Sequence, residues 1–391
     1  MLGLHKLKKN IMNKQDLIKK TKRVVIKIGS ALLIDSETGK LQKNWLETLA
    51  FDINNLIRSG IEVIIVSSGS IALGKKQLNL RNNLSLDEKQ AAAATGQITL
   101  AHAWKETMSK YELNVAQILL APDDTETRRK HLNARATLIR LLDLNVIPVI
   151  NENDTVSTEE IRFGDNDRLA ARVAQMCSAD LLVLLSDING LYSSDPNKNE
   201  NSVFIDEITE INSEIENMAG PKHTSISSGG MVTKIEAAKI ATNAGCHMII
   251  CDGRVDNPLL KLQQINSKFS WFKANHQPMN ARKQWISAAL QVKGQIIIDR
   301  GASDAIKKGN SVLSAGIIGT EGTYEKGDLI KIVDQNKKII GKGLTHFNQA
   351  EVELIKGSHS DNIESILGYR GKDEVVHRDD LVIEKSKSKN L

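Results

Sequence analysis

The sequence predicts an α/β domain with a mainly parallel sheet between helices, followed by a small, mostly β domain. From about residue 23 to residue 275, short apolar runs alternate with longer runs that have helical spacing. Such alternation is typical of parallel sheets, because each crossover needs a helix. The strand-like runs are apolar throughout, which indicates burial on both faces. After Arg282, short strand-like runs are separated by glycine turns, which predicts the second domain.

The elements can be assigned in order from periodicity. The predicted strands of the first domain are Val24–Ile28, Ile61–Val66, Val115–Leu120, Val146–Ile150, Leu181–Leu185 and Met248–Ile250. Its predicted helices are Trp45–Arg58, Ala91–Tyr111, Arg128–Leu144, Arg168–Met176 and Thr233–Ala244. In the second domain, the strand-like runs are Gln295–Asp299, Thr323–Val333 and Lys338–Leu344, and the short helical runs are Ser303–Lys308 and Ser360–Leu367. We therefore expect a leader at 1–22, domains at 23–275 and 291–388, and a linker at 276–290.

Positive charge is concentrated at the start of the chain. The 391 residues carry a net charge of +5, but residues 1–23 hold eight Lys or Arg and one acid, Asp16, which gives that segment +7 and leaves −2 on the rest. A nearly neutral body does not favour nucleic acid or a membrane as the main ligand. Short charged termini are commonly disordered, so we expect a flexible leader; a weak arm for anionic surfaces is the alternative.

The cysteines and the apolar segments bear on the compartment. Cys177, Cys246 and Cys251 form no C-x-x-C pair, and three cysteines cannot all pair within one chain. Reduced, buried thiols are the default for such a set, and they fit the cytosol. The leader lacks the apolar run of a signal peptide, and no stretch approaches the roughly 18 apolar residues of a membrane span. We expect a cytoplasmic protein without a membrane partner.

Small and polar residues follow the predicted strands where each one ends. Gly29 and Ser30 follow the first strand, Ser67–Ser70 the second, Asn151–Asp154 the fourth and Ser186–Asp187 the fifth. In open α/β sheets, ligands bind beyond the carboxyl ends of the strands. The sequence therefore predicts a polar crevice at this edge of the sheet.

Lys27 interrupts an otherwise apolar strand just before its glycine turn. An ammonium group beside the backbone N–H groups of the turn at Gly29 suits a phosphate. The alternative is an edge-strand lysine that prevents aggregation.

Two later motifs carry further polar groups. Gly164–Asp167 precedes a helix, and its three consecutive Asp or Asn side chains exceed what one helix cap needs; some could bind an amino group, a metal or a lysine. Ser228–Lys234 opens another helix with two glycines, whose N–H groups and helix dipole favour an anion, with Lys234 facing it. The alternatives are a plain cap for the first motif and a flexible loop for the second.

Together these groups fit phosphoryl transfer. Lys27 and Lys234 can neutralise charge on a transferred phosphoryl group, while Asp167 and Asp187 either position Mg²⁺ or hold the lysines in place. The sequence has no Walker P-loop, no Ser-His-Asp hydrolase elbow and no zinc spacing. It therefore predicts an ATP-dependent small-molecule kinase.

The motifs resemble those of the amino acid kinase superfamily, most closely its glutamate 5-kinase branch, which ends in a PUA domain. The resemblance covers about residues 23–385. It rests on Val25–Ser30, Val66–Gly74, Val149–Asp154, Phe163–Asp167, Leu185–Asp187, Gly190–Tyr192 and Gly229–Lys234, and in the tail on Gly301–Ile306, Ile366–Tyr369 and Val376–Asp380. The departures are small: Ser70 stands where the family usually has Ala, and Ser228 where it usually has Thr.

The resemblance implies transfer of a phosphoryl group from ATP to the γ-carboxylate of L-glutamate, the first step of proline synthesis. It assigns glutamate binding to Ser68, Asp154 and Asn166, and catalysis to Lys27, Lys234 and Asp167, with Asp167 orienting the lysines. It assigns ATP binding to Lys27, Ser186, Asp187, Ser228, Gly229, Gly230, Met231, Val232, Thr233 and Lys234. Mg²⁺ is implied without a direct protein ligand that can be assigned. Feedback inhibition by proline and a homodimer or homotetramer are also implied.

Two other functions compete with this interpretation. A related kinase would act on aspartate, acetylglutamate or a nucleotide, but the strings at 151–154 and 164–167 and the PUA-like tail argue against it. PUA domains elsewhere bind RNA. Residues 291–391, however, hold 16 Lys or Arg against 15 Asp or Glu, which is a poor electrostatic footprint for RNA.

Overall fold

The structure of the protein is a computed structural model that describes residues 14, 17–81, 83–156, 166–220, 230–278, 281 and 291–384. The chain divides into two units, residues 1–278 and residues 279–391. Residues 1–13 of the expected leader and most of the expected linker lie outside the described residues. The domain bounds 23–275 and 291–388 stay predictions.

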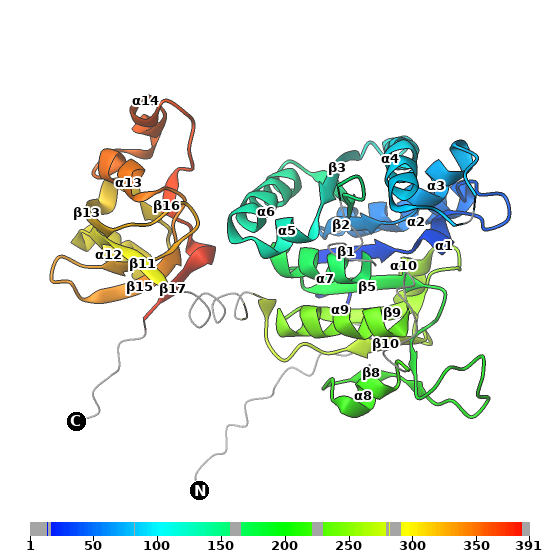
Figure 1. The fold of residues 1–391 in the computed structure, drawn as a ribbon. Helices are drawn as coiled ribbons and strands as arrows, with labels where there is room; N and C mark the ends of the chain where they lie inside the picture. Colours follow the sequence, from blue (N-terminus) through cyan, green and yellow to red (C-terminus); the bar gives the residue numbers. More distant parts are fainter. Residues whose placement is uncertain are drawn as a thin grey trace, which may run out of the picture. The chain divides into compact units, whose positions relative to one another are not determined.

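An eight-stranded sheet forms the centre of the first unit, in the order β3-β4-β2-β1-β5-β9-β10-β8 (Figure 1). All neighbouring strands are parallel except β9 and β10, which confirms the predicted mainly parallel sheet. The strands are β1 (Arg23–Ile28), β2 (Glu62–Ser67), β3 (Asn114–Leu120), β4 (Val146–Glu152), β5 (Leu181–Ser186), β8 (Glu207–Ile208), β9 (His247–Asp252) and β10 (Phe269–Phe272). A separate pair, β6 (Leu191–Tyr192) and β7 (Phe204–Ile205), lies outside this sheet.

Helices cover both faces of the sheet. The helices of this unit are α1 (Ser30–Leu33), α2 (Lys43–Arg58), α3 (Ser70–Gln77), α4 (Leu86–Ser109), α5 (Pro122–Glu126), α6 (Arg128–Asp143), α7 (Asn166–Cys177), α8 (Ser213–Asn217), α9 (Met231–Asn243) and α10 (Pro258–Leu262). Residues of α2, α4 and α10 join one buried apolar cluster, and residues of α6, α7 and α9 join the cluster on the opposite face. Within the described ranges, every helix is too short or too polar to cross a lipid bilayer.

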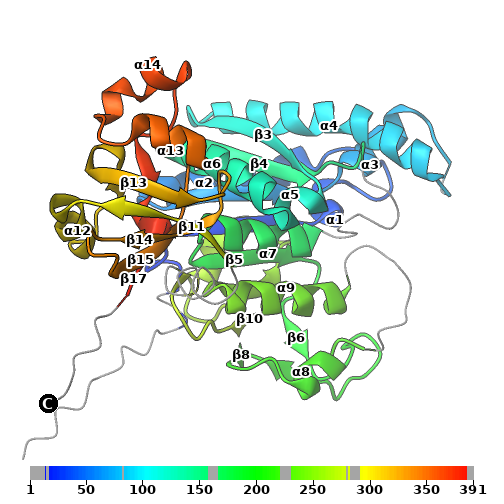
Figure 2. The ribbon, with the colours of Figure 1, turned by 60° about the vertical axis from the view of Figure 1, so that its left-hand side comes forward.

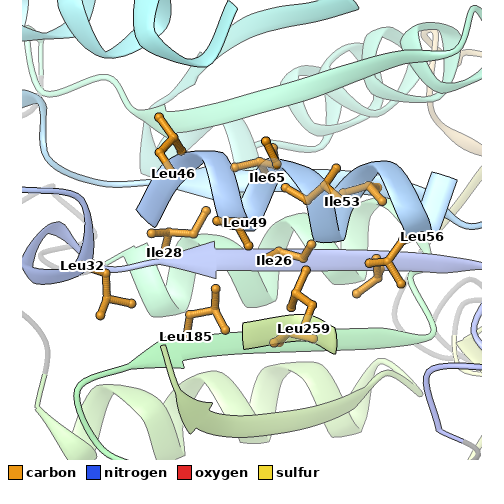
Figure 3. Packing of buried hydrophobic residues seen from close by; sticks show 14 of the residues in the cluster. Ile26, Ile28, Leu32, Leu46, Leu49, Ile53, Leu56, Ile65, Leu185 and Leu259 are labelled. Carbon is orange, nitrogen blue, oxygen red and sulfur yellow. The ribbon is translucent and has the colours of Figure 1, made fainter. Parts of the chain in front are cut away.

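The apolar residues of strand β1 contribute side chains to the hydrophobic clusters on both faces of the sheet. Ile26 and Ile28 belong to the cluster with α2, whereas Val25 belongs to the cluster with α7 and α9. Figure 3 shows Leu49 and Ile53 of α2 lying against β1, at the four-residue spacing that places both on one helix face. Because side chains alternate along a strand, Lys27 points to the same face as Val25, towards α7 and α9.

Local signals explain where α4 begins. The predicted start at Ala91 is five residues late, because Ser85 caps the helix and forms a reciprocal capping box with Glu88. The helix α4 lies beside α3 (Figures 1 and 2) and contacts β3.

The last residues of the expected leader are part of the folded unit. Leu17 is 1% exposed and belongs to the core cluster of α2 and α4, and the Thr21 hydroxyl donates to the Leu17 carbonyl over 2.8 Å. The backbone N–H groups of Lys22 and Arg23 donate to the Asp180 carboxylate. The prediction of a flexible leader up to residue 22 is therefore wrong for residues 17–22, because one apolar side chain and paired backbone groups fix this segment.

We expect Leu17→Ala to lower the free energy of unfolding by about 2–5 kcal/mol, the usual cost of emptying a buried leucine site. Urea unfolding followed by circular dichroism measures the change. Lys19→Ala, at an exposed position of the same segment, is the control and should leave the midpoint unchanged. A loss below about 1 kcal/mol for Leu17→Ala would mean that the segment adds little to the fold.

The second unit has its own sheet and core. A five-stranded sheet runs in the order β13-β11-β14-β15-β17, with only β11 and β14 parallel. Its elements are β11 (Val292–Ile298), α12 (Arg300–Lys307), β12 (Val312–Leu313), β13 (Ile317–Gly322), β14 (Leu329–Val333), β15 (Ile339–Leu344), α13 (Gln349–Ile355), α14 (Ile363–Leu367), β16 (Glu374–Val376) and β17 (Leu381–Ile383). The predicted small, mostly β domain is confirmed.

One predicted strand of this unit is wrong in part. The run Thr323–Val333 was expected to be one strand, but only Leu329–Val333 is, and the strand before it ends at Gly322. Gly322 and Gly327 both have positive φ, 95° and 90°, so the chain turns between them. The strand Ile317–Gly322 gave a weak signal because its second half is polar and half exposed.

Candidate active site

The candidate site lies where the central strands end. β1 lies between β2 and β5, and Lys27 pairs in register with Val66 and Leu184 of these neighbours. Lys27 is therefore on a central strand, which excludes the alternative of an edge-strand lysine. The helices α3, α7 and α9 begin close to this edge of the sheet, and the strand order changes direction around β1, which is where ligands of open α/β sheets bind.

Two lysines and one carboxylate meet at this edge of the sheet. Lys27 Nζ lies 2.5 Å from Asp167 Oδ1, and Lys234 Nζ lies 3.2 Å from Asp167 Oδ2. Asp167 is 0% exposed, and both lysines are 5% exposed. The three residues come from β1, α7 and α9, so the sheet and both helices of one face fix their positions. With two positive groups on one negative group, the cluster keeps a net positive charge that suits an anion.

The charge state of Asp167 follows from its partners. Burial alone would raise the pKa of Asp167, but the ammonium groups of Lys27 and Lys234 outweigh burial and lower the pKa to about 2. The carboxylate also lies in the first turn of α7, where the helix dipole favours a negative charge. Asp167 is therefore ionised near neutral pH.

The residues expected to hold the acceptor lie next to this cluster. Asn166 Nδ2 donates to Ser68 Oγ over 2.8 Å and to the Ser67 carbonyl over 3.1 Å. The structure thus brings together Ser68, which directly follows β2, and Asn166, the first residue of α7. Asp154 lies half-buried, two residues beyond the end of β4 at the same sheet edge.

A cavity of about 850 Å³ has Lys234 in its wall. Three of the predicted ATP-binding residues, Asp187, Met231 and Lys234, line it. The Ser186 hydroxyl donates to the Asp187 carboxylate over 3.0 Å, and this hydrogen bond orients the carboxylate just after the end of β5. The cavity and the lysine cluster share Lys234, so a ligand in the cavity would place its end at the cluster.

The start of α9 accounts for the rest of the predicted ATP-binding loop. Gly230 is the N-cap of α9, and Met231, Val232 and Thr233 form the first turn with Lys234. The Thr233 hydroxyl lies 2.8 Å from the Gly230 carbonyl and 3.2 Å from Asp167 Oδ2. The predicted contacts of Ser228 and Gly229 lie outside the described residues.

Comparison with known proteins decides the family. Residues 22–252 match the profile of the amino acid kinase family, and residues 294–367 match that of the PUA domain. A glutamate 5-kinase of Paramagnetospirillum magneticum is 51% identical over 363 residues, which are 93% of this chain and 98% of that protein. Glutamate 5-kinases of Rhodopseudomonas palustris and Nitrobacter hamburgensis are each 49% identical, over 93% and 94% of this chain and 96% and 97% of theirs. The chain belongs to the glutamate 5-kinases of the amino acid kinase family.

One charged residue of the cavity wall, Arg254, is not among the residues predicted from the sequence. Arg254 lines the cavity and pairs with both oxygens of Asp252, at 2.9 and 2.8 Å. It follows the end of β9 by two residues. Ligands of open α/β sheets bind beyond the carboxyl ends of the strands, and Arg254 follows β9 as the other polar residues follow the earlier strands. The same argument from the sequence could therefore have identified Arg254.

Proposed function

We propose that this crevice carries out the glutamate 5-kinase reaction: ATP phosphorylates the γ-carboxylate of L-glutamate to give γ-glutamyl phosphate, the first step of proline biosynthesis. The observation that carries the proposal is the pair of buried lysines on Asp167. Asp167 directly follows Asn166, which contacts Ser68, and Lys234 lines the large cavity. A phosphoryl donor in the cavity and a carboxylate acceptor beside Asn166 would meet at these lysines.

The two ammonium groups supply the electrostatic stabilisation. During transfer, negative charge is spread over the phosphoryl oxygens, and buried positive groups at fixed positions stabilise that charge more than water does. No protein base is needed, because the γ-carboxylate of glutamate has an ordinary pKa near 4.3 and is already ionised. Catalysis then rests on position and charge.

Asp167 acts as a positioning residue for the lysines. Its lowered pKa and its two ion pairs make it unsuitable as a base, since a base must give up its partners to take a proton. Its role is to hold Lys27 and Lys234 within reach of the same phosphoryl group. It also offsets one of the two buried positive charges before substrate binds.

The acceptor side fits an amino acid. The Ser68 oxygen accepts a hydrogen bond from Asn166, so its own O–H is left to donate to a substrate carboxylate. The Asp154 carboxylate at the same edge suits the substrate ammonium group. Ser68, Asp154 and Asn166 are therefore the proposed glutamate-binding residues.

The nucleotide side fits ATP with Mg²⁺. The proposed ATP-binding residues are Lys27, Ser186, Asp187 and the stretch from Ser228 to Lys234. Mg²⁺ prefers carboxylate, phosphate and water oxygens, and the exposed Asp187 carboxylate at the cavity wall is such a donor. The described residues gather no group of three His, Cys, Asp or Glu side chains that could hold a metal, so the ion would be held chiefly by ATP and water. It would neutralise phosphate charge during transfer.

The family also supports three further proposals, each without a dedicated contact in the described residues. They are feedback inhibition by proline, assembly into a homodimer or homotetramer, and a cytoplasmic location. RNA binding stays disfavoured, because residues 291–391 hold 16 Lys or Arg against 15 Asp or Glu, a net charge of only +1.

A panel of acceptors tests the function directly. The purified chain is incubated with ATP, Mg²⁺ and hydroxylamine, which traps an acyl phosphate as a hydroxamate, and with L-glutamate, L-aspartate or N-acetyl-L-glutamate. We expect hydroxamate from glutamate, loss of the signal when Mg²⁺ is chelated, and a lower rate with proline. Faster turnover of aspartate or N-acetylglutamate than of glutamate would contradict the proposal.

A further inference from the structure

Three buried amide side chains form a hydrogen-bonded chain behind the acceptor site. Asn151, at the end of β4, accepts at Oδ1 from Asn166 Nδ2 over 2.8 Å. Its own Nδ2 donates to Gln97 Oε1 of α4 over 2.8 Å and to Ser70 Oγ over 3.1 Å. Gln97 is 8% exposed, and both asparagines are buried. The chain therefore links α4 to the residue that contacts Ser68.

Two backbone groups identify which atom of each asparagine amide is the oxygen and which is the nitrogen. The backbone N–H of Glu152 can only donate, so the Asn151 atom 2.9 Å from it must be the oxygen. The carbonyl of Ser67 can only accept, so the Asn166 atom 3.1 Å from it must be the amino nitrogen. The Asn151 amino group then has to face Gln97 and Ser70, both of which supply an acceptor.

Helix packing explains why a glutamine of α4 reaches this point. A Cβ atom on Gly96 would lie 1.9 Å from the Ser70 carbonyl oxygen, and one on Gly74 would lie 1.8 Å from the Ala92 carbonyl oxygen. The backbones of α3 and α4 are thus in direct contact at two glycines. Gln97 directly follows Gly96 in α4, and its side chain reaches Asn151 at the end of β4.

We propose that Gln97 is a positioning residue for the amino acid acceptor, a role that rests on the proposed function. By accepting from Asn151, Gln97 holds that amide in the orientation that accepts from Asn166. Asn166 in turn keeps its amino group on Ser68 and leaves its carbonyl oxygen for the substrate, with the Ser68 O–H free to donate. Among the described residues, the hydrogen bond of the Gln97 side chain is to Asn151 and not to Lys27, Lys234 or Asp167, and Gln97 does not line the cavity. Its loss should affect the acceptor and not the nucleotide.

Gln97→Met tests this role, because methionine has a similar length and no acceptor of comparable strength. We expect the KM for glutamate to rise about fivefold to tenfold, the effect of losing the orientation of one neutral hydrogen-bonding group. We expect the KM for ATP and kcat to stay within about twofold, since the Lys27 and Lys234 positions are unchanged. Initial rates over both substrates, with a melting curve for each variant, give these values.

Ser70 offers a second measurement on the same amide. Ser70→Ala removes the longer of the two acceptor contacts and should raise the KM for glutamate by less than about threefold, because Gln97 still holds Asn151. In the Gln97→Met background, the same change removes the second of the two acceptors that Asn151 has among the described residues. The rise in the KM for glutamate of the double variant should therefore exceed the product of the two single rises. Gln77→Met is the matched control, since Gln77 donates to Thr99 over 2.6 Å on the exposed surface of the same helix pair.

The possible outcomes distinguish a failure of the positioning role of Gln97 from a failure of the proposed kinase function. If the wild-type chain phosphorylates glutamate, and the KM for glutamate of Gln97→Met and of the double variant stays within twofold of the wild-type value, the role of Gln97 is overturned and the proposed function stands. An equal rise in the KM for ATP also overturns the role of Gln97, because that indicates general disruption. A wild-type chain without glutamate turnover overturns both proposals. Should Gln97→Met not fold, Gln97→Asn withdraws the acceptor by one methylene and must give the same selective rise.

Discussion

Replacing Lys27 or Lys234 with methionine is expected to lower kcat about 10²- to 10³-fold while changing the KM values for glutamate and ATP far less. Each ammonium group lies buried at Asp167, at the junction of the acceptor side and the cavity. An interaction that grows with the charge of the transition state lowers the barrier without tightening substrate binding to the same degree. Loss of one such donor usually costs two to three orders of magnitude in kcat. Steady-state kinetics with both substrates varied measures the split.

A lysine of the same helix supplies the control. Lys239 of α9 pairs with Glu216 at 2.7 Å and is partly exposed, so Lys239→Met makes the same change outside the cluster and should keep wild-type kinetics. An unchanged kcat in both cluster variants would contradict the mechanism. A large rise in KM with kcat retained would mean that the lysines bind ground-state phosphates and give the transition state no added stabilisation.

The sequence predicted the crevice because its groups follow a simple geometric rule. Parallel strands place their carboxyl ends at one edge, so the residues after β1, β2, β4 and β5 had to come close together. Lys27 and Lys234 could be paired from the amino-acid sequence alone, since both sit at glycine turns and both suit a phosphate. The folded chain adds that Asp167 joins them, at distances of 2.5 and 3.2 Å.

Other residues could not be found in this way, and the reason is physical. Gln97 lies inside the long helix α4, and a single polar residue on a helix carries no signal about what it faces. Its contact with Asn151 depends on the close approach of α3 and α4 at Gly74 and Gly96, which is a property of packing. Leu17 was hidden by the charged residues around it, because one buried side chain can anchor a segment whose composition indicates disorder.

Asp167→Asn is expected to affect stability as well as activity. The change removes the counter-ion of two buried ammonium groups, and breaking a buried pair by removing one partner usually costs about 3–5 kcal/mol. With their common partner gone, Lys27 and Lys234 also lose the positions needed for transfer, so we expect kcat to fall by at least about 10²-fold. Urea unfolding at neutral pH and the hydroxamate assay measure the two effects on the same preparation.

Asp52→Asn separates loss of this charge cluster from loss of any buried carboxylate. Asp52 is also buried, but it accepts from the backbone N–H groups of Leu259 and Leu260 and from Asn257, so no buried cation is left behind when its charge is removed. We expect a loss of about 1–2 kcal/mol and normal turnover. Equal effects of the two changes on stability and kcat would contradict the role of Asp167.

The pH dependence of stability should differ between the two carboxylates. The pKa of Asp167 is lowered to about 2, so its contribution to stability is complete above its ordinary pKa near 4 and is lost as the pH falls from there through 2. The stability gap between the wild type and Asp167→Asn should therefore narrow over that range. Burial raises the pKa of Asp52, so its ionisation opposes folding as the pH rises, and the gap for Asp52→Asn should widen on acidification. A gap for Asp167→Asn that stayed constant down to pH 2 would mean that the lysines do not depend on this carboxylate.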